Sequence, residues 1–394
     1  MTDDLSRRTL GCGISLAGDT DQAATESVRA ALDGRAPTGN DLVLVFPTSH
    51  YEPQRFLDAA VRAAGPAQVV GCTSYAAFTA EAHVTQGAVA AYLPAAELSF
   101  GIAAEGSLST DIFSTARRCT KSARDRAGGR AEHSVLLLLS DAIAGDQREV
   151  VRGSYLVTGA TVPLVGGAAA EDSEAVPVTY QFAEGRAMTD GLVAVWINSP
   201  YPLGIGVDHG WYPIGEPMIV TRAEENVIHE LDGRPAAEVY LANRGNDFLP
   251  LEIAGRAFAR ATYDHPLGIA TTSGRFEIRH ILNRTDSGAL VMFGHLSEQS
   301  VVNVMAGEAQ DLVKAAGRAA GEAVGQLVTP PRGGLVFSCT GRVPALGAQV
   351  TAEAAAAHSA MGGTPICGFY TYGEFARVTG STGFHNATVA VLAV

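Results

Sequence analysis

Two charged side chains near the end of the chain have the types and the spacing to bind a small zwitterion. Arg342 follows the apolar run that ends at Phe337-Ser-Cys339, and Glu374 follows a second run that ends at Tyr370-Thr371. An arginine can hold a carboxylate with two parallel hydrogen bonds, and a glutamate can hold an ammonium group. The pair therefore predicts a site for an amino acid or a similar small zwitterion. The alternative is a structural ion pair that ties two loops together.

Small polar residues stand at the ends of several apolar runs, where they could give a ligand further hydrogen bonds. These candidate ligand-binding residues are Thr73, Ser74, Asp141, Ser338, Cys339 and Tyr370. Serine, threonine and aspartate in such positions also cap helices and stabilise turns. That structural role is the alternative for each of them.

A thiol-dependent enzyme is a rival interpretation. Cys72 and Cys339 each lie at the end of an apolar run, and His50 follows a neighbouring run. A Cys–His pair there could carry out acyl transfer. However, the sequence has no nucleophile elbow and no His-Glu-x-x-His motif, and a buried cysteine commonly serves as a small apolar residue. We therefore expect no catalytic residues.

The cysteines also bear on metals and on the cellular compartment. The five stand at positions 12, 72, 119, 339 and 367, and no two of them have the spacing of zinc ligands. An odd number of thiols without a disulfide pattern is typical of a reducing compartment. The sequence thus predicts a cytoplasmic protein without a metal site.

Composition excludes several classes of protein. Apolar residues make up 47% of the 394 residues, charged residues 18%, and the mean hydropathy is +0.12. This balance is typical of a globular protein and not of a disordered chain. The net charge of −13 argues against partners such as nucleic acid or an anionic membrane surface, which attract basic proteins. No apolar run approaches the roughly 20 residues of a membrane-spanning helix.

Three segments of the chain resemble one another and must position the candidate residues: 12–93, 99–197 and about 300–394. Each is expected to contain a short strand, a helix, a strongly apolar strand, a second helix, a glycine-containing strand and a closing strand. The expected first strands are 13–17, 100–103 and 301–305. The expected first helices are 21–32, 110–127 and 308–327, and the second helices are 53–64, 147–158 and about 348–361.

The glycine-containing strand shows the repeat best. It is found as Gln68-Val-Val-Gly-Cys-Thr-Ser74, Pro163-Leu-Val-Gly-Gly-Ala-Ala169 and Pro365-Ile-Cys-Gly-Phe-Tyr-Thr371. The sequence therefore predicts an α/β fold of repeated βαβαββ units that form mainly parallel or mixed sheets covered by helices. Ligands of such sheets usually bind at the carboxyl ends of the strands.

The stretch 204–294 departs from the repeat and is expected to form a β-rich linking layer. A hairpin is predicted over 218–222 and 226–231, followed by a helix that starts near Pro235 and continues to Tyr240. Further strands are expected at 276–282 and 289–293. The segment begins with a Gly-x-Gly-x-x-x-Gly motif at 204–210, but Trp211-Tyr-Pro213 follows it instead of a helix, so we discount nucleotide binding.

Several motifs carry a resemblance to a known family. The run from Glu225 to Tyr240, containing Glu-Leu-Asp-Gly-Arg-Pro-Ala, resembles the opening of the C-terminal FIST domain (F-box and intracellular signal transduction). The segments Phe337–Arg342, Gly368–Glu374 and His385–Thr388 resemble later parts of that domain. The segments 42–46, 69–74 and 165–172 resemble the N-terminal FIST domain. On this resemblance, residues 12–203 form the N-terminal domain and 204–394 the C-terminal domain.

The resemblance implies a bacterial sensory protein that binds a small ligand, an amino acid being the usual suggestion. It also implies a separate output partner, such as a histidine kinase or a cyclic-dinucleotide enzyme. No cofactor is expected, but one branch of the family binds haem and senses nitric oxide, so haem is the alternative. The histidines considered as its axial ligand are His209, His229, His280 and His295.

Overall fold

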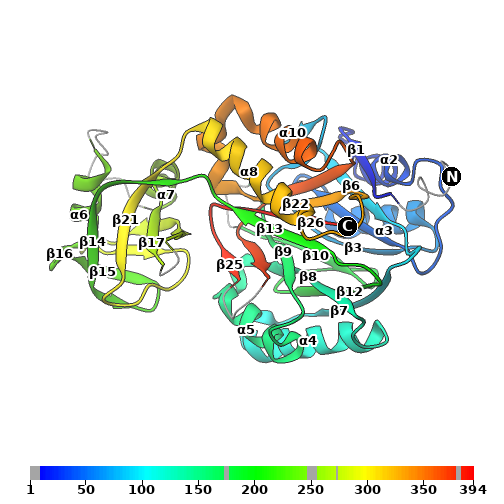
Figure 1. Ribbon diagram of the computed structural model, residues 1–394, viewed down its shortest axis with the longest axis horizontal. Helices are drawn as coiled ribbons and strands as arrows, with labels where there is room; N and C mark the ends of the chain where they lie inside the picture. Colours follow the sequence, from blue (N-terminus) through cyan, green and yellow to red (C-terminus); the bar gives the residue numbers. More distant parts are fainter. Residues whose placement is uncertain (1–8, 173–176, 246–254, 272–273, 379–382) are drawn as a thin grey trace.

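A barrel of three sheets covered by helices forms the main body of the protein, and a β-rich lobe lies at one side of it (Figure 1). The computed structural model describes residues 9–172, 177–245, 255–271, 274–378 and 383–394. Each of the three sheets has six strands within this described part. The mixed α/β architecture predicted from the repeat is confirmed.

Each repeat unit supplies four strands to one sheet and two helices to its outer face. The first unit forms β1 (Gly11–Ser15), α2 (Thr20–Leu32), β2 (Leu42–Pro47), α3 (Pro53–Ala64), β3 (Gln68–Cys72) and β6 (Ala88–Leu93). The second forms β7 (Ser99–Glu105), α4 (Ile112–Arg126), β8 (His133–Asp141), α5 (Gln147–Thr158), β9 (Leu164–Ala169) and β12 (Leu192–Ser199). The third forms β13 (Gly204–Asp208), α8 (Ala309–Val324), β22 (Gly334–Cys339), α10 (Val350–Ala360), β23 (Ile366–Thr371) and β26 (Val389–Ala393).

The strands pair in the same way in every unit. In the first, β6 lies antiparallel between β1 and β2, so that Ala90 faces Gly13 on one side and Val45 on the other. The strand β2 then runs parallel to β3. The parallel pairs β8–β9 and β22–β23 repeat this arrangement. The carboxyl ends of these six strands therefore lie at corresponding places in the three sheets.

A hairpin from each unit completes the sheet of another unit. The hairpins are β4 (Ala77–Thr79) with β5 (His83–Val84), β10 (Gln181–Ala183) with β11 (Arg186–Met188), and β24 (Glu374–Arg377) with β25 (Phe384–His385). They pair with β23, β3 and β9 respectively. Two of the three sheets thus combine strands from both predicted halves, 12–203 and 204–394. This exchange joins the units into one barrel.

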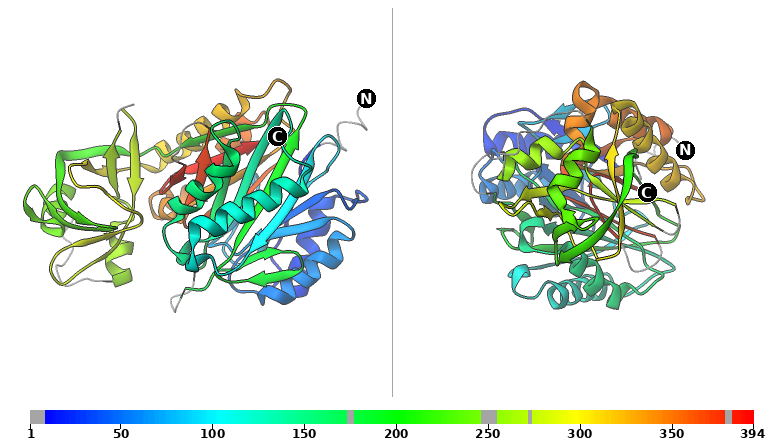
Figure 2. Two further views of the ribbon diagram at one scale, coloured as in Figure 1. Left: turned by 90° about the horizontal axis from the view of Figure 1, so that it is seen from below. Right: turned by 90° about the vertical axis from the view of Figure 1, so that its left-hand side faces the viewer.

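The apolar strands are buried on both faces, as continuous apolar runs predict. Alternate side chains point into the barrel or outward against the helices. Those in the barrel core include Leu44, Leu137 and Leu335, and their neighbours packed under helices are Val43, Leu136 and Val336. Figure 2, in its right-hand view, shows helices arranged around the sheets.

The strand predicted over 301–305 is present, but its assignment as the first strand of the third unit was wrong. Residues 301–305 belong to β21 (Val301–Ala306), which pairs with strands of the lobe. The strand β13 takes the expected place, because it pairs with β26 as β1 pairs with β6. A Cβ on Gly206 would lie 1.9 Å from the Ala319 carbonyl oxygen, and one on Gly13 would lie 2.0 Å from that of Ser27. Only glycine allows the first helix to approach its strand this closely.

The lobe, residues 211–306, is called the insert below because it interrupts the third unit between β13 and α8. It contains β14 (Tyr212–Glu224), β15 (Val227–Leu231), β16 (Arg234–Pro235), α6 (Ala236–Arg244), α7 (Gly255–Thr262), β17 (Leu267–Ala270), β18 (Phe276–Arg279), β19 (Ile281–Arg284), β20 (Leu290–Met292) and β21. The predicted hairpin and β-rich layer are confirmed. The insert has its own apolar core, which includes Val220, Ile228 and Val302.

Two chain segments join the insert to the barrel, one before β14 and one after β21 (Figures 1 and 2). Trp211 anchors the first, since its ring is buried in the barrel and its Nε1 donates to the Ala387 carbonyl oxygen at 2.8 Å. In the second, a Cβ on Gly307 would meet the Trp211 ring at 2.7 Å. Both connections therefore converge on Trp211. In the described residues, no helix is both long and apolar enough to cross a membrane.

Candidate ligand-binding site

A large cleft lies between the barrel and the insert. Its volume is about 1190 Å³. Pockets that hold drug-sized or cofactor-sized molecules commonly measure about 300–1000 Å³. The cleft is therefore large enough for a substantial organic ligand.

The barrel wall of the cleft is formed just beyond the carboxyl ends of its parallel strands, where the repeat predicts a ligand site. It contains Tyr75 after β3; Ala142, Ile143 and 145–148 after β8; Glu171, Asp172 and Pro177 after β9; 339–341 and Pro344 at the end of β22; Tyr372 after β23; and Phe384 and Asn386. Three different sheets thus contribute to one wall.

The insert forms the opposite wall. Its residues come from the β14–β15 turn, the helix α7 and the strands β19 and β20: Glu225, Asn226, Ala259, Arg260, Tyr263, His280, Leu282 and 292–295. Because the cleft lies between the insert and the barrel, a ligand that fills it would contact both.

His280 is the most unusual residue of the insert wall. It is 6% exposed, and neither of its ring nitrogens has a hydrogen-bond partner in the described structure. Burial lowers the pKa of His280 to about 4, so the imidazole is neutral at neutral pH. Its ring meets Tyr263 edge-on at 5.4 Å and lies against the barrel at Gly341, where a Cβ would fall 1.9 Å from Nε2. A buried unpaired polar group costs about 1–3 kcal/mol.

Asn386 presents a second unpaired polar atom, from the barrel wall. The side chain is 1% exposed, and its Oδ1 accepts no hydrogen bond from any described residue. The following residue, Ala387, has a φ of 53° and accepts the hydrogen bond of Trp211. The loop that carries Asn386 is therefore tied to the junction of the insert.

Further polar groups line the same cleft. Tyr372 donates its hydroxyl to Glu171, with 2.9 Å to Oε1 and 2.8 Å to the carbonyl oxygen. Burial, together with the neighbouring Glu171, raises the pKa of Tyr372 well above its usual value. Cys339 also lines the cleft and is buried, which raises the pKa of its thiol well above its ordinary range.

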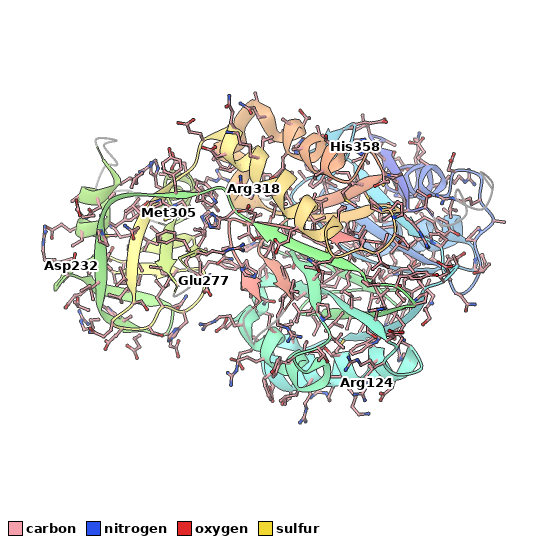
Figure 3. All side chains as sticks on the ribbon, viewed as in Figure 1. Arg124, Asp232, Glu277, Met305, Arg318 and His358 are labelled. Atoms are coloured by element: carbon pink, nitrogen blue, oxygen red, sulfur yellow. The ribbon has the colours of Figure 1, made fainter. Side chains whose placement is uncertain are left out.

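Two ion pairs, one on the barrel and one on the insert, lie within electrostatic range of each other near the cleft. On the barrel, Arg148 holds Asp146 through Nε at 3.0 and 3.1 Å. Burial raises the pKa of Asp146, but the bonds from Arg148 outweigh it and keep the pKa below its ordinary value. On the insert, Arg279 pairs with Glu277 at 3.0 Å, and Figure 3 shows Glu277 on the side of the insert that faces the barrel. In each ion pair, the arginine and the carboxylate largely compensate each other's charge.

The structure brings three of the predicted ligand-binding residues together around a carboxylate and away from the cleft. Arg342 donates to Glu353 Oε1 from Nε at 2.9 Å and from Nη2 at 2.7 Å, and it also donates to the carbonyl oxygens of His209 and Leu312. Ser338 and the Tyr370 hydroxyl donate to the same carboxylate. Both charged groups are fully buried. The prediction that Arg342 clamps a ligand is therefore corrected to a structural ion pair.

Glu374 is likewise occupied by its neighbours. Its Oε1 accepts from the Thr371 hydroxyl, and its Oε2 accepts from Thr388, at 2.6 Å from the hydroxyl and 3.2 Å from the backbone nitrogen. Burial raises the pKa of Glu374 to about 7, although these bonds oppose the rise. The carboxylate links β24 to the start of β26. It is not among the residues that line the cleft.

The remaining predicted residues have structural roles. Thr73 accepts the backbone N–H of Tyr180 at 3.0 Å, and the Ser74 hydroxyl donates to the Pro47 carbonyl oxygen at 3.1 Å. Asp141 accepts from the Ile143 backbone N–H and the Thr179 hydroxyl, both at 2.9 Å, and from the Asp190 backbone N–H at 2.8 Å. Of the eight predicted ligand-binding residues, Cys339 alone lines the cleft. Capping and turn formation, the structural alternative, therefore accounts for Thr73, Ser74 and Asp141.

The thiol pairing considered from the sequence has little geometric support. Cys72 is fully buried in the barrel core, and this burial raises its pKa well above the ordinary value. His50 lies instead beside Asp172, with 3.5 Å between Nε2 and Oδ2. Within the described ranges, no group of three or more His, Cys, Asp or Glu residues could hold a metal ion.

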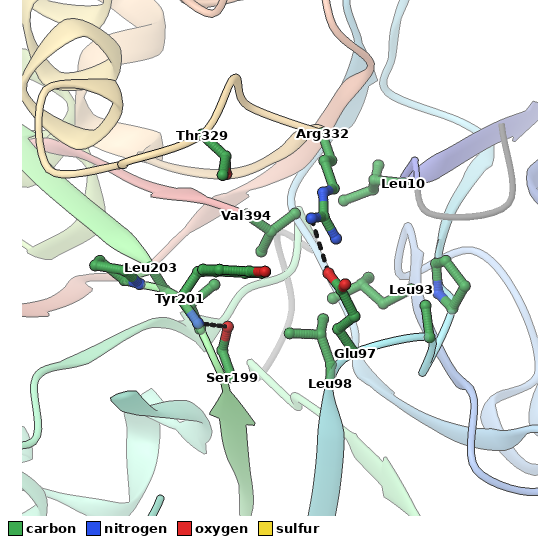
Figure 4. Close-up of a pocket in the computed structure, with 13 residues that line it drawn as sticks. Leu10, Leu93, Glu97, Leu98, Ser199, Tyr201, Leu203, Thr329, Arg332 and Val394 are labelled. Atoms are coloured by element: carbon green, nitrogen blue, oxygen red, sulfur yellow. Dashed lines mark hydrogen bonds and ion pairs between the residues drawn. The ribbon is translucent and has the colours of Figure 1, made fainter. Parts of the chain in front are cut away.

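A second, much smaller pocket lies where the last strands of the three units end. It is lined by residues such as Leu93, Ser199 and Val394 and has a volume of about 30 Å³, enough for one water molecule (Figure 4). An ion pair between Arg332 and Glu97, 2.9 Å long, crosses it. Its size excludes an organic ligand.

The residues that sequence reasoning missed were the ones that the insert brings to the barrel. His280 was considered only as one of four histidines, and Asn386 only as part of a family motif. Glu353 stands alone in the alanine-rich run 352–358, and a single charge among alanines on a buried helix face could have indicated its partner Arg342. No sequence pattern predicts the contact of His280 with Gly341.

Comparison with known proteins shows which family has this arrangement. A model of the FIST N domain matches residues 41–234, and a model of the FIST C domain matches residues 236–377. An uncharacterized protein of Mycobacterium tuberculosis is 29% identical over 403 residues, covering 97% of this chain and 98% of its own. An uncharacterized protein of Mycobacterium bovis is 26% identical, covering 97% of each chain.

Among solved structures, the chain has a limited likeness to the cyanuric acid hydrolase from A. caulinodans. The TM-score is 0.28 at 11% identity, covering 48% of this chain and 70% of the other. The two family models together match most of the chain, and FIST domains are generally sensory domains of signal transduction. The chain therefore belongs to the FIST family.

Proposed function

We propose that this protein is a sensory module that binds a small molecule in the cleft between barrel and insert. The observation that carries the proposal is that two buried side chains on opposite walls, His280 and Asn386, each have a polar atom without a partner in the described residues. A ligand that bonds to both would relieve two desolvation penalties and join the walls. Such a ligand shifts the protein toward the arrangement that it binds better.

The first ligand class to test is an amino acid or a similar zwitterion. Carboxylates and guanidinium groups both line the cleft, including Glu171 and Arg260. This mixture offers partners for both ends of a zwitterion. The volume of about 1190 Å³ leaves room for a large side chain or for a derivative of the amino acid.

The signal would pass to a separate protein in the cytoplasm, such as a histidine kinase or a cyclic-dinucleotide enzyme. Support for the route comes from the junction, where Trp211 contacts the loop of Asn386 through Ala387. A ligand at Asn386 would therefore alter the segment that holds the insert in place. Five free thiols fit a reducing compartment.

Haem is the second candidate. The cleft is large enough for haem, but the position of His280 does not suit an axial ligand. The nitrogen that usually binds iron, Nε2, faces Gly341, whose backbone occupies the space that an iron would need. His295 also lines the cleft, but nothing about its geometry singles it out as a ligand. A thiol-dependent enzyme has less support, because burial disfavours the thiolates of Cys72 and Cys339.

A thermal-shift panel with matched variants tests the proposal. The full chain would be screened with amino acids, small carboxylates and amines, with haemin followed in parallel by its absorbance. A ligand at 100 times its dissociation constant should stabilise the protein by about 2.7 kcal/mol. His280→Leu and Asn386→Leu should reduce this shift. His83→Leu is the control, because Nε2 of His83 is also buried and unpaired but lies outside the cleft.

The outcomes are distinct. A shift that disappears in both cleft variants and persists in the control supports the proposal. If haemin gives an absorbance band and no other compound shifts the melting temperature, the protein would be assigned as a haemoprotein. The absence of any shift and of any haemin band would refute ligand sensing in this cleft.

A further inference from the structure

We infer that the ligand of the cleft is an organic cation, namely an amine that carries an aromatic or apolar arm. This inference rests on the proposed function of the cleft. It narrows the ligand class from zwitterions to molecules that carry an ammonium group and no carboxylate. The hydrogen-bonding groups, the charges and the apolar surfaces of the two walls all favour such a ligand.

Apart from the Arg148 guanidinium, which pairs with Asp146, the charged groups of the barrel wall are acceptors. The unpaired atom of Asn386 is its Oδ1, which needs an N–H or O–H donor. Glu171 presents a carboxylate, and the Tyr372 hydroxyl already donates its proton to Glu171, so its oxygen is left to accept. An ammonium group has three donors and no acceptor, which matches such a wall.

The charges of the lining also favour a cation. The Asp146–Arg148 pair is internally compensated, with Nε of Arg148 between both carboxylate oxygens. Apart from that pair, three carboxylates line the cleft and one guanidinium group does: Glu171, Asp172, Glu225 and Arg260. His280 adds no positive charge at neutral pH, because burial lowers its pKa to about 4.

One feature of the wall would ordinarily attract an anion, namely the N-terminus of α5. Helix N-termini bind anions through free backbone N–H groups. Here Asp146 already occupies that position, since its Oδ1 accepts from the Arg148 backbone nitrogen at 3.0 Å. A ligand carboxylate would have to displace this side chain.

Apolar surface on both walls would hold the arm of the ligand. Ile143 on the barrel is 47% exposed, and Leu282 on the insert is 37% exposed, although both are large apolar residues that line the cleft. Phe293 of the insert lies 6.1 Å from Phe384 of the barrel, ring centroid to centroid. Aromatic faces attract cations in addition to apolar groups.

The test compares ligands that share an arm and differ in charge. Phenethylamine, phenylalanine and phenylacetate form one set, and tryptamine, tryptophan and indole-3-acetate form a second. Calorimetric titration of the full chain should give dissociation constants for the amines at least about tenfold below those of the amino acids, a difference of 1.4 kcal/mol. The carboxylates should show no saturable binding.

Substitutions at Asn386 separate the ligand class from the location of the site. Asn386→Asp keeps the shape of the side chain and adds a negative charge. It should therefore lower the dissociation constants of the amines but not those of the amino acids. Asn386→Leu should weaken the amines about tenfold or more, as expected for loss of a hydrogen bond to a charged group. His83→Leu should leave all six constants unchanged, and the melting temperature of each variant reports whether it folds.

Equal or tighter binding of the amino acids or carboxylates would overturn the inference and leave the proposed function intact. Amine dissociation constants that are unchanged in both Asn386 variants would overturn the inference as well, because the cation would then bind elsewhere. If the protein bound none of the six, nor any other member of the panel, the proposed function would fail together with the inference.

Discussion

The substitution Gly341→Ala tests how the insert is held against the barrel. A Cβ at this position would lie 1.9 Å from His280 Nε2, 2.4 Å from Cε1 and 2.8 Å from Cδ2. Ordinary contacts of this kind begin at 3.4 Å, so the imidazole and the new methyl group must separate by at least 1.5 Å. The ring is buried and packed on Tyr263, so it cannot simply rotate into solvent.

The expected cost falls on the contact between insert and barrel. Overpacking of a buried contact typically costs about 1–3 kcal/mol. That corresponds to about 5- to 150-fold in the equilibrium between docked and undocked insert. Gly341 lies in a short helical turn without a positive φ, so alanine suits its backbone and the barrel should remain folded.

Hydrogen exchange measured by mass spectrometry is the appropriate assay. Peptides from β18 and β19, which flank His280, should exchange faster in Gly341→Ala, whereas peptides from β8 and β22 should not change. The ligand of the cleft should bind more weakly by a similar factor. The double variant Gly341→Ala/His280→Ala should recover wild-type exchange, because the smaller side chain removes the clash. Unchanged exchange and affinity in Gly341→Ala would falsify the proposed docking contact.

Three other predictions concern the buried groups of the barrel and the junction. Because burial raises the pKa of Glu374 to about 7, its protonated form favours folding below pH 4.5, and this contribution disappears as the pH rises through 7. Urea unfolding from pH 5 to pH 8 should therefore show a smaller decline for Glu374→Gln than for wild type, and an identical decline would contradict the assignment. Arg342→Met should lower stability by about 3–5 kcal/mol, as does breaking a buried ion pair, because it leaves the Glu353 carboxylate buried without a charge partner. Loss of ligand affinity without loss of stability would instead restore Arg342 to the ligand site. Trp211→Phe keeps an aromatic side chain but loses part of the buried indole and the 2.8 Å bond to the Ala387 carbonyl oxygen, so it should cost at least about 0.5–1.5 kcal/mol and increase exchange in the insert. Increased exchange confined to the barrel would argue against Trp211 as the anchor of the insert.

The repeat predicted most of the barrel because its signals are local. Apolar runs of strand length, alanine-rich helices and glycine turns recur in register, and the second helices at 53–64 and 147–158 lie where they were expected. The first strand of the third unit was missed for an equally local reason. An insertion of about a hundred residues separates β13 from α8, and the glycine spacing at 204–206, which matches that at 11–13, was the available signal.

The candidate site was predicted at the correct edge of the sheets but largely with the wrong residues. Arg342 and Glu374 were chosen because charged groups at strand ends often bind ligands. Whether such a group meets a ligand or an internal partner depends on which helix packs beside it. Here Glu353 on α10 and the threonines beside Glu374 satisfy them.

The amino-acid sequence by itself determined the family, the repeated α/β units and the β-rich layer, because these depend on periodicity and on short motifs read along the chain. Tertiary structure alone decided which polar groups remain unpaired. The insert and the barrel are separate in sequence, and their meeting buries His280 against Gly341 and leaves the Asn386 oxygen without a donor. Desolvation of a polar atom is a property of everything that surrounds it, so no pattern along one stretch of chain could have revealed it.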